Sequence, residues 1–444
     1  MVSKRPGAAR SEAKPSEVEK VASDESLTAG PRAEPRRPRR ALVFSGGGAR
    51  GAYEAGVVRY LVEELPRRVG HPINFDILCG TSVGAIHACY MAATHQQGPS
   101  RGQQLVDFWR RMRIEEVLPF RRRDLFGLGR RALGLRRMRD VFSSGTAPER
   151  IYGLLNTERL EKMVVRAVPW RRIRSNVNAG HVKAVCVAAT EIATGRVVVF
   201  LDTGDRALPG WTRDPSVVPH ITHLRPTHAL ASAAIPLLFP AVRIHSTYYA
   251  DGGLRLNTPL SPALRLGADR VLVVALRPHA QHAHAATLAS HRVEDYASPF
   301  YMFGKILNSM LLDHLDTDLA RMRVMNEMIR DGERAFGPDY LDRINDVSES
   351  ERGQRFRVIE DLVIRPSADL GAMASEVLQT IPHASLRSPF FRLAMRNLGA
   401  DGRSAESDLF SYLLFDGDFL APLTDLGYRD AAAQEDALVR FFED

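Results

Sequence analysis

Two strand-like segments near the start of the chain each run directly into a glycine-rich turn and then a helix-like stretch. Residues 41–44 (ALVF) precede the run GGGARG at 46–51, and residues 75–79 (FDILC) precede GTSVG at 80–84. The first turn can bind an anion, because the first N–H groups of a helix have no partner inside that helix. The second turn can expose a serine. A serine that attacks a carbonyl creates negative charge on its oxygen, so the pair favours acyl transfer or hydrolysis.

Ser82 is the candidate nucleophile. In the pattern G-x-S-x-G, the serine lies on a strained strand-to-helix turn, and its hydroxyl points away from the sheet. Gly80 and Gly84 flank the turn because a Cβ there would collide with the neighbouring strand or helix. Residues 83–93 are mostly small and apolar, as in a buried helix, and its N-terminus adds partial positive charge beside the serine. The alternative is a serine at a helix N-cap between two chance glycines.

The run at 46–51 also fits the dinucleotide-binding pattern G-x-G-x-x-G. That function requires an acidic residue at the end of the next strand, about 20 residues on. Here Glu63 and Glu64 lie in a helix-like stretch, and the next strand ends at the serine turn. Three consecutive glycines followed closely by Arg50 are better suited to an oxyanion, because bare N–H groups converge on one atom beside a cation.

A serine nucleophile needs a base. The apolar stretch that ends at residues 248–250 (YYA) continues into Asp251 and two glycines. An aspartate in this position is either a turn residue or a positioned carboxylate. As a base it must be partly desolvated, because burial raises the proton affinity of a carboxylate.

The three segments, in this order, resemble the signatures of the patatin-like phospholipases, and so does ASAAIP at 231–236. That family uses a Ser–Asp dyad with no histidine, so the resemblance implies Ser82 as nucleophile and Asp251 as base. Ser45 stands where plant members often have an acid, and bacterial members commonly carry serine there. The implied oxyanion hole comprises Gly46, Gly47, Gly48 and Arg50, and the remaining motif glycines are Gly51, Gly80, Gly84, Gly252 and Gly253.

A Ser-His-Asp triad is the alternative site. Its histidine would have to come after the aspartate, and His279, His282 and His284 do follow Asp251. We expect these three in a solvated loop, and we expect His87 in the core. No carboxylate or cysteine lies at ligand spacing from the histidines, so we expect no metal. Acyl hydrolysis by a serine needs no organic cofactor, and we expect none.

The resemblance implies an α/β fold of three layers, α/β/α, with a mainly parallel central sheet, helical insertions and a helical C-terminal region. The rest of the sequence alternates between strand and helix patterns, and hydrophobic residues make up 45% of the 444 residues. We expect one catalytic domain over 41–370 and a helical extension over 371–444 packed on it. The predicted elements are strands at 182–189, 196–201, 271–276 and 356–364 and a short helix at 227–234.

A long helix is predicted over residues 300–330, where apolar residues recur at helical spacing. We interpret this stripe as part of the core. It consists of Leu307, Leu311, Leu315, Leu319, Met322, Met325 and Ile329.

Cysteine usage and the N-terminal composition bear on the compartment. Cys79, Cys89 and Cys186 all lie in apolar segments, which indicates buried thiols, a reducing compartment and no disulfide framework. Residues 1–40 lack apolar periodicity and the apolar region of a secretory signal, and we expect a disordered basic tail. We therefore expect a cytoplasmic protein.

The net charge of +8 is unevenly distributed, with many arginines among leucines and phenylalanines over residues 110–150. No apolar run approaches about 18 residues, so no membrane span is predicted. We expect 110–150 to be an insertion or flap in peripheral contact with an anionic membrane surface. A cap on the enzyme's own acidic face is the second interpretation. Nucleic acid is a distant third, because no binding motif accompanies the charge.

The sequence therefore predicts a lipid acyl hydrolase of the phospholipase A or lysophospholipase type, acting on phospholipid or another lipid ester. The same dyad could serve an acyltransferase, and the triad a Ser-His-Asp esterase. A binding module with a dead site is disfavoured by the intact Ser82 and Asp251. We also expect Asn257 to hydrogen-bond the loop of the aspartate. Head-group preference and oligomeric state do not follow from these residues.

Overall fold

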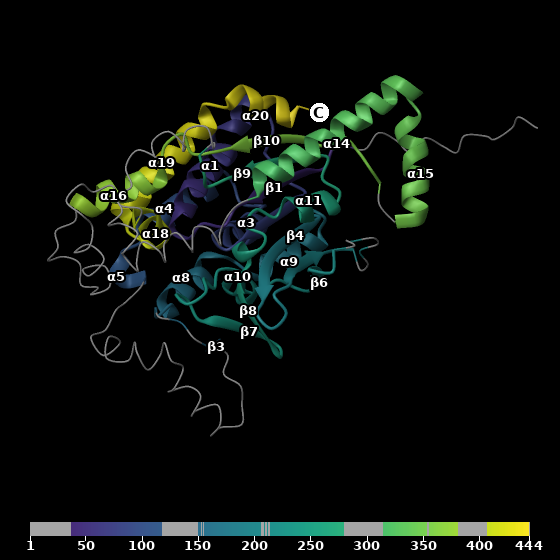
Figure 1. The fold of residues 1–444 in the computed structure, drawn as a ribbon. Helices are drawn as coiled ribbons and strands as arrows, with labels where there is room; N and C mark the ends of the chain where they lie inside the picture. The colour runs from purple at the N-terminus through teal and green to yellow at the C-terminus, as the bar shows by residue number, and fades with distance from the viewer. Residues whose placement is uncertain are drawn as a thin grey trace, which may run out of the picture. The chain divides into compact units, whose positions relative to one another are not determined.

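The computed structural model describes residues 37–117, 150–278 (without 152, 154, 206–207, 209–210 and 212–213), 314–380 (without 353–354) and 406–443 (Figure 1). The predicted tail over 1–40 falls almost wholly outside these residues. So do residues 118–149 of the arginine-rich segment.

Ten strands of the described chain form one sheet, in the order β10-β9-β1-β2-β4-β8-β7-β3, with β5 beside β4 and β6 beside β5. The run from β10 to β4 is parallel, while β5 and β8 both pair antiparallel with β4. The predicted mainly parallel α/β sheet is therefore confirmed. The strands are β1 Arg40–Phe44, β2 Ile77–Thr81, β3 Arg150–Ile151, β4 Ala184–Glu191, β5 Val197–Thr203, β6 Val217–Ile221, β7 Ala241–Ile244, β8 Thr247–Asp251, β9 Arg270–Val274 and β10 Glu360–Ile364.

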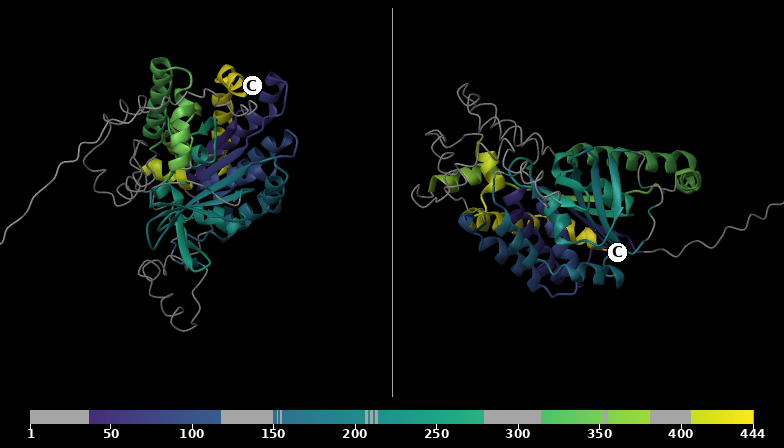
Figure 2. Two further views of the ribbon diagram at one scale, coloured as in Figure 1. Left: turned by 90° about the vertical axis from the view of Figure 1, so that its right-hand side faces the viewer. Right: turned by 90° about the horizontal axis from the view of Figure 1, so that it is seen from below.

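Helices cover both faces of the sheet (Figure 2). The strands alternate: Leu42 and Phe44 of β1 face one core, and Ala41 and Val43 face the other. The larger core lies under α1, α3, α4, α9, α16 and α18–α20, and the smaller under α11 and α14. The helices are α1 Gly51–Glu63, α2 Leu65–Val69, α3 Val83–Ala93, α4 Ser100–Arg110, α5 Ile114–Val117, α8 Glu158–Ala167, α9 Arg171–Asn178, α10 Pro226–Ser232, α11 Leu260–Arg265, α14 Leu315–Phe336, α15 Tyr340–Arg352, α16 Leu370–Thr380, α18 Glu406–Leu413, α19 Gly417–Ala432 and α20 Glu435–Phe442.

Strands β2 and β8 meet end to end along one edge of β4. Thr81, the last residue of β2, pairs with Ala188 of β4, and Asp251, the last residue of β8, pairs with Ala189. The two strands run in opposite directions relative to β4, so their C-terminal ends face each other. This arrangement brings the residue after Thr81 next to Asp251.

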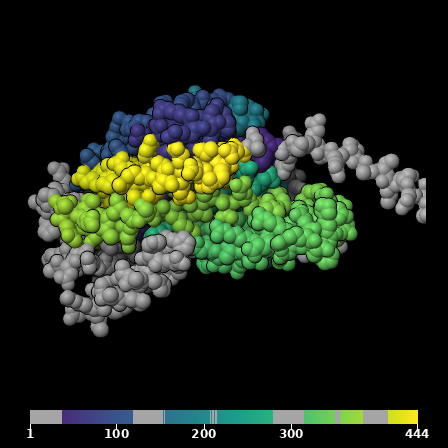
Figure 3. Space-filling view, turned by 90° about the horizontal axis from the view of Figure 1, so that it is seen from above, coloured from purple at the N-terminus to yellow at the C-terminus, as the bar shows by residue number. Residues whose placement is uncertain are grey.

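The C-terminal helices pack directly on the first helix. Figure 3 shows them in yellow as a band beside the purple segment that contains α1. The backbones of α1 and α19 touch: a Cβ on Gly56 would lie 2.0 Å from the Thr424 carbonyl oxygen, and one on Gly427 would lie 2.0 Å from that of Tyr53. The predicted helical C-terminal region is thus confirmed.

The described part of the long predicted helix is α14, Leu315–Phe336, while residues 300–313 lie outside the described residues. One member of its apolar stripe is wrong. In α14, Leu315, Leu319, Met322 and Ile329 are buried, but Met325 is 42% exposed. Asn326 is buried instead, because its side chain donates to the Ile359 carbonyl (2.7 Å) and accepts from the Ile359 N–H (2.9 Å). Leu307 and Leu311 lie outside the described residues.

Two further expectations concern burial and the membrane. All three cysteines are buried and free, as predicted. Of the helices that the structure describes, none combines the length and the apolar character needed to cross a bilayer.

The junction of β8 and β4 provides a stability prediction. A Cβ on Gly252 would lie 2.2 Å from the Ala188 carbonyl oxygen, a backbone atom that cannot move aside. Gly252→Ala should therefore lower the free energy of unfolding by about 1–3 kcal/mol in urea denaturation. The control is Gly98→Ala, since nothing lies within 4 Å of a Cβ at that position. Equal stability of the two variants would contradict the described packing.

Candidate active site

Ser82 lies on the predicted sharp turn between β2 and α3. Its backbone has φ 56° and ψ −123°, and a positive φ is strained for a residue with a side chain. Ser232, at the end of α10, stabilises this strained conformation. Its Oγ accepts a hydrogen bond from the Ser82 N–H (2.8 Å) and donates one to the Ala188 carbonyl (2.5 Å). Ser82 is 4% exposed. The turn is therefore fixed from two sides, by the sheet and by α10.

The glycines that flank Ser82 allow close backbone packing. A Cβ on Gly80 would lie 2.0 Å from the Gly84 carbonyl oxygen, and one on Gly84 would lie 2.7 Å from the carbonyl oxygens of Phe44 and Ser45. The N-terminus of α3 thus packs against the end of β1. This contact sets the serine turn beside the glycine-rich loop.

Asp251 contacts Ser82 directly. The Ser82 hydroxyl donates to Asp251 Oδ2 (2.7 Å), and the Gly253 N–H donates to Asp251 Oδ1 (2.7 Å). The backbone of the aspartate is held as well, since its N–H donates to the Ala234 carbonyl (2.9 Å) and its carbonyl accepts from Thr190 Oγ1 (2.9 Å). The structure therefore brings together the two residues that the sequence singles out, 169 positions apart.

Burial raises the pKa of the Asp251 carboxyl, so its carboxylate is a stronger base. The side chain is 1% exposed, and desolvation raises the pKa from 3.8 to about 7, although the hydrogen bonds from Ser82 and Gly253 act in the opposite direction. A carboxylate with this pKa accepts a proton far more readily than a solvated one does.

The glycine loop lies beside Ser82. A Cβ on Gly46 would lie 3.2 Å from the Ser82 Cβ, so the loop and the serine are neighbours. The N–H groups of Gly47 and Gly48 make no hydrogen bond to any residue that the structure describes. Gly48 has φ +56°, a conformation that favours glycine.

Gly46 differs from the expectation for this loop. Its N–H donates to the Asn257 carbonyl (3.0 Å), and its own carbonyl accepts from Asn257 Nδ2 (3.3 Å). In this conformation the Gly46 N–H is thus already hydrogen-bonded to the protein and does not point to a substrate as a free donor. Asn257, which we expected to bond the aspartate's loop, bonds the glycine loop instead.

Arg50 also differs, because its guanidinium contacts α18. The Arg50 Nε donates to Ser411 Oγ (2.8 Å), Nη1 donates to the Tyr412 hydroxyl (3.3 Å), and the guanidinium carbon lies 4.1 Å from the Tyr412 ring centroid. The Arg50 N–H donates to the Gly47 carbonyl within the loop (3.1 Å). These contacts fit a residue that positions the loop.

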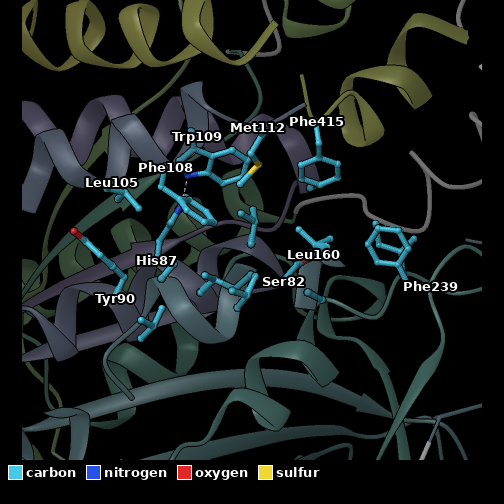
Figure 4. Close-up of a pocket in the computed structure, with 18 residues that line it drawn as sticks. Ser82, His87, Tyr90, Leu105, Phe108, Trp109, Met112, Leu160, Phe239 and Phe415 are labelled. Carbon is cyan, nitrogen blue, oxygen red and sulfur yellow. Dashed lines mark hydrogen bonds between the residues drawn. The ribbon is translucent and has the colours of Figure 1, made fainter. Parts of the chain in front are cut away.

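An apolar cavity, partly open to solvent, extends from Ser82. Figure 4 shows aromatic and aliphatic side chains gathered around it, from α3, α4, α8 and the segment after α18. Its lining residues include Val83, Ile86, Leu105, Phe108, Trp109, Met112, Leu160, Val164, Ile235, Phe239 and Phe415.

His87 lies in the core, as expected. It is 0% exposed; its Nδ1 is 2.6 Å from Glu54 Oε2, and its Nε2 accepts from Trp109 Nε1 (3.0 Å; Figure 4). Because the indole N–H can only donate, the His87 proton belongs on Nδ1. Burial lowers the pKa of His87 to about 3, so the ring is neutral. The candidate triad residues His279, His282 and His284 lie outside the described residues.

Sequence reasoning missed three residues that hold the site. Ser232 was seen only as part of the ASAAIP segment, and that segment was the one signal for it, because its contact with Ser82 joins residues 150 positions apart. Ser411 and Tyr412 carry no local signal, because only the packing of α18 brings them to the loop.

The comparisons with known proteins identify the family of the chain. A sequence model of the patatin-like phospholipase family matches residues 42–264, just over half of the 444 residues. The chain belongs to the patatin-like phospholipase family.

One curated relative is a cGAMP-activated phospholipase of Pseudomonas aeruginosa (strain BWHPSA011 / Pa011), 28% identical over 227 residues. The match covers 49% of this chain and 53% of that protein, so the chain aligns with only about half of the relative's length. Among solved structures, VipD from Legionella pneumophila matches with 13% identity and a TM-score of 0.29, over 90% of this chain and 67% of that one.

The pKa of Asp251 predicts a pH-dependent stability. The native state holds the Asp251 proton more tightly than the unfolded chain does. As the pH rises from 3.8 to about 7, the unfolded chain therefore ionises first and the native state loses stability relative to it. Relative to Asp251→Asn, the wild type should lose up to about 4 kcal/mol of unfolding free energy across this window and then stay level. Urea denaturation at several pH values measures the difference, and a difference that does not vary with pH would contradict the raised pKa.

Proposed function

We propose that this chain is a lipid acyl hydrolase in which Ser82 is the nucleophile and Asp251 the general base. The observation that carries the proposal is the 2.7 Å hydrogen bond from the Ser82 hydroxyl to a buried carboxylate, with Ser82 lining an apolar cavity. Membership of the patatin-like phospholipase family supports it. The phospholipase name of the Pseudomonas relative supports a lipid ester as substrate.

In the first half of the reaction, Ser82 Oγ attacks the ester carbonyl carbon while its proton passes to Asp251 Oδ2. The carbonyl oxygen becomes an oxyanion, for which the N–H groups of Gly47 and Gly48 are the proposed donors. The tetrahedral intermediate then breaks its bond to the alcohol oxygen. The alcohol leaves with the proton from Asp251, and the acyl group stays on Ser82.

In the second half, water attacks the acyl-serine and gives a proton to Asp251. The same donors hold the new oxyanion, and its collapse breaks the acyl–oxygen bond to Ser82. Ser82 Oγ takes the proton back from Asp251, and the fatty acid leaves. An acceptor alcohol in place of water would make the enzyme an acyltransferase, so fatty acid must be measured as the product.

The cavity supports an aliphatic acyl chain as the group on the carbonyl. Its walls are almost entirely apolar, and the polar pair His87 and Trp109 satisfies itself by a mutual hydrogen bond. Burial of each methylene contributes roughly 0.8 kcal/mol to binding. An aliphatic chain that enters the cavity with its carbonyl at Ser82 would therefore gain binding energy from the hydrophobic effect.

The test is fatty-acid release from mixed phospholipid and neutral ester vesicles. Ser82→Ala should lower the release by about 10³-fold or more. In the wild type, kcat/KM should rise with pH to a plateau above about 7, because Asp251 acts as a base only when ionised and burial raises its pKa to about 7. The proposal would be wrong if Ser82→Ala released fatty acid as fast as the wild type. It would also be wrong if the wild type only transferred the acyl group to another alcohol and released no fatty acid.

We also propose that the arginine-rich residues 110–150 bind an anionic membrane surface. The net charge of +8 and the mixture of arginine with leucine and phenylalanine support this binding. Vesicles with anionic lipid should bind the protein less tightly as salt is raised, and binding should weaken further when Arg121, Arg122 and Arg123 are replaced by alanine. Neutral vesicles are the control. If vesicle binding changes neither with salt nor with the triple substitution, the proposal is refuted.

A further inference from the structure

The end of α18 contacts the glycine loop from a distant part of the sequence. Ser411 and Tyr412 follow Arg50 by 361 and 362 residues, and they lie beyond residue 264, where the match to the family ends. The contact is close: a Cβ on Gly48 would lie 2.3 Å from the Tyr412 carbonyl oxygen. The backbone of α18 therefore packs directly against the loop.

Arg50 connects the loop to α18. Its side chain is 5% exposed, donates to Ser411 Oγ and to the Tyr412 hydroxyl, and lies over the face of the Tyr412 ring at 4.1 Å. A guanidinium over an aromatic face in a buried place is held by cation–π attraction as well as by hydrogen bonds. Arg50 thus fixes the C-terminal end of the loop against α18.

The segment that follows α18 is itself fixed to the core. The Gly417 N–H donates to the Met112 carbonyl (2.8 Å), and Asp416 Oδ2 accepts the Ile114 N–H (3.3 Å). Between these bonds and Tyr412, the Phe415 ring stacks on Trp109 at 6.3 Å between centroids and lines the cavity beside Ser82. One short stretch, residues 411–417, therefore contacts both the glycine loop and the cavity.

A glycine loop needs such support for catalysis. Glycines have no side chains to restrain them, and their backbone has more freedom than that of any other residue. The donors of an oxyanion hole contribute fully only when they are already held at the position that the oxyanion will occupy. A shift of about 1 Å can lower the rate by about 100-fold.

We propose that Tyr412, together with Ser411, is a positioning residue for catalysis. Acting through Arg50, it holds the N–H groups of Gly47 and Gly48 at the substrate carbonyl. The catalytic part of this inference rests on the proposed hydrolase function, whereas the structural part, a loop restrained by α18, does not.

The test compares Tyr412→Leu with Tyr428→Leu. Tyr428 is the matched control, because Arg59 of α1 lies 5.1 Å from its ring centroid in another cation–π pair with a C-terminal helix, away from the glycine loop. With p-nitrophenyl butyrate, Tyr412→Leu should lower kcat by about 10- to 100-fold and leave KM within about 2-fold. Tyr412→Phe should keep most of kcat because it retains the ring. Tyr428→Leu should keep kcat.

A double-mutant cycle shows whether Tyr412 acts through Arg50. If it does, Arg50→Ala and Arg50→Ala/Tyr412→Leu should have the same kcat, because the second change removes nothing further. Losses that multiply, or a kcat for Tyr412→Leu equal to that of Tyr428→Leu, would overturn the proposal.

Hydrogen–deuterium exchange tests the inference without activity. In Tyr412→Leu the peptide covering residues 45–51 should exchange faster, while peptides from the central strands should not change. Unchanged exchange in the loop would overturn the inference even in an active enzyme, whereas a wild type without Ser82-dependent release would overturn the proposed function alone. If Tyr412→Leu does not fold, Ser411→Ala/Tyr412→Phe removes both hydrogen bonds from Arg50 with little loss of volume and must show the same two effects, at smaller size.

Discussion

The end-to-end meeting of β2 and β8 on one edge of β4 is the constraint on which the site depends. It places Thr81 and Asp251 opposite consecutive residues of β4, so the next residue, Ser82, must turn toward the aspartate. The resulting hydrogen bond is 2.7 Å long and lies inside the protein. No flexible loop supplies either partner, since both side chains are fixed to strand ends.

Two destabilising features follow from this arrangement, and the surroundings offset both. The Ser82 backbone is strained, and Ser232 holds it by a hydrogen bond from α10. The Asp251 carboxyl is desolvated, and hydrogen bonds from Ser82 and Gly253 partly compensate. Strain and a raised pKa at one place are typical of functional sites, because stability alone would select against them.

The sequence predicted the parts of this structure that local pattern controls. The two strand–turn–helix units, the parallel sheet and the contact between Ser82 and Asp251 are found as expected. The dyad chemistry stays a prediction. Local pattern could not predict the features that depend on tertiary packing. The Gly46 N–H donates to the Asn257 carbonyl, and the Arg50 guanidinium binds α18. In α14, Asn326 is buried where Met325 was expected.

The central claim is that Asp251 activates Ser82, and the rate of covalent labelling by a fluorophosphonate tests it most directly. Peptide mass spectrometry of the labelled protein identifies the modified residue. The account predicts an adduct on Ser82, formed much more slowly in Asp251→Asn than in the wild type and unaffected by changes at His279, His282 and His284. An adduct elsewhere, or equal labelling rates in Asp251→Asn and the wild type, would contradict it.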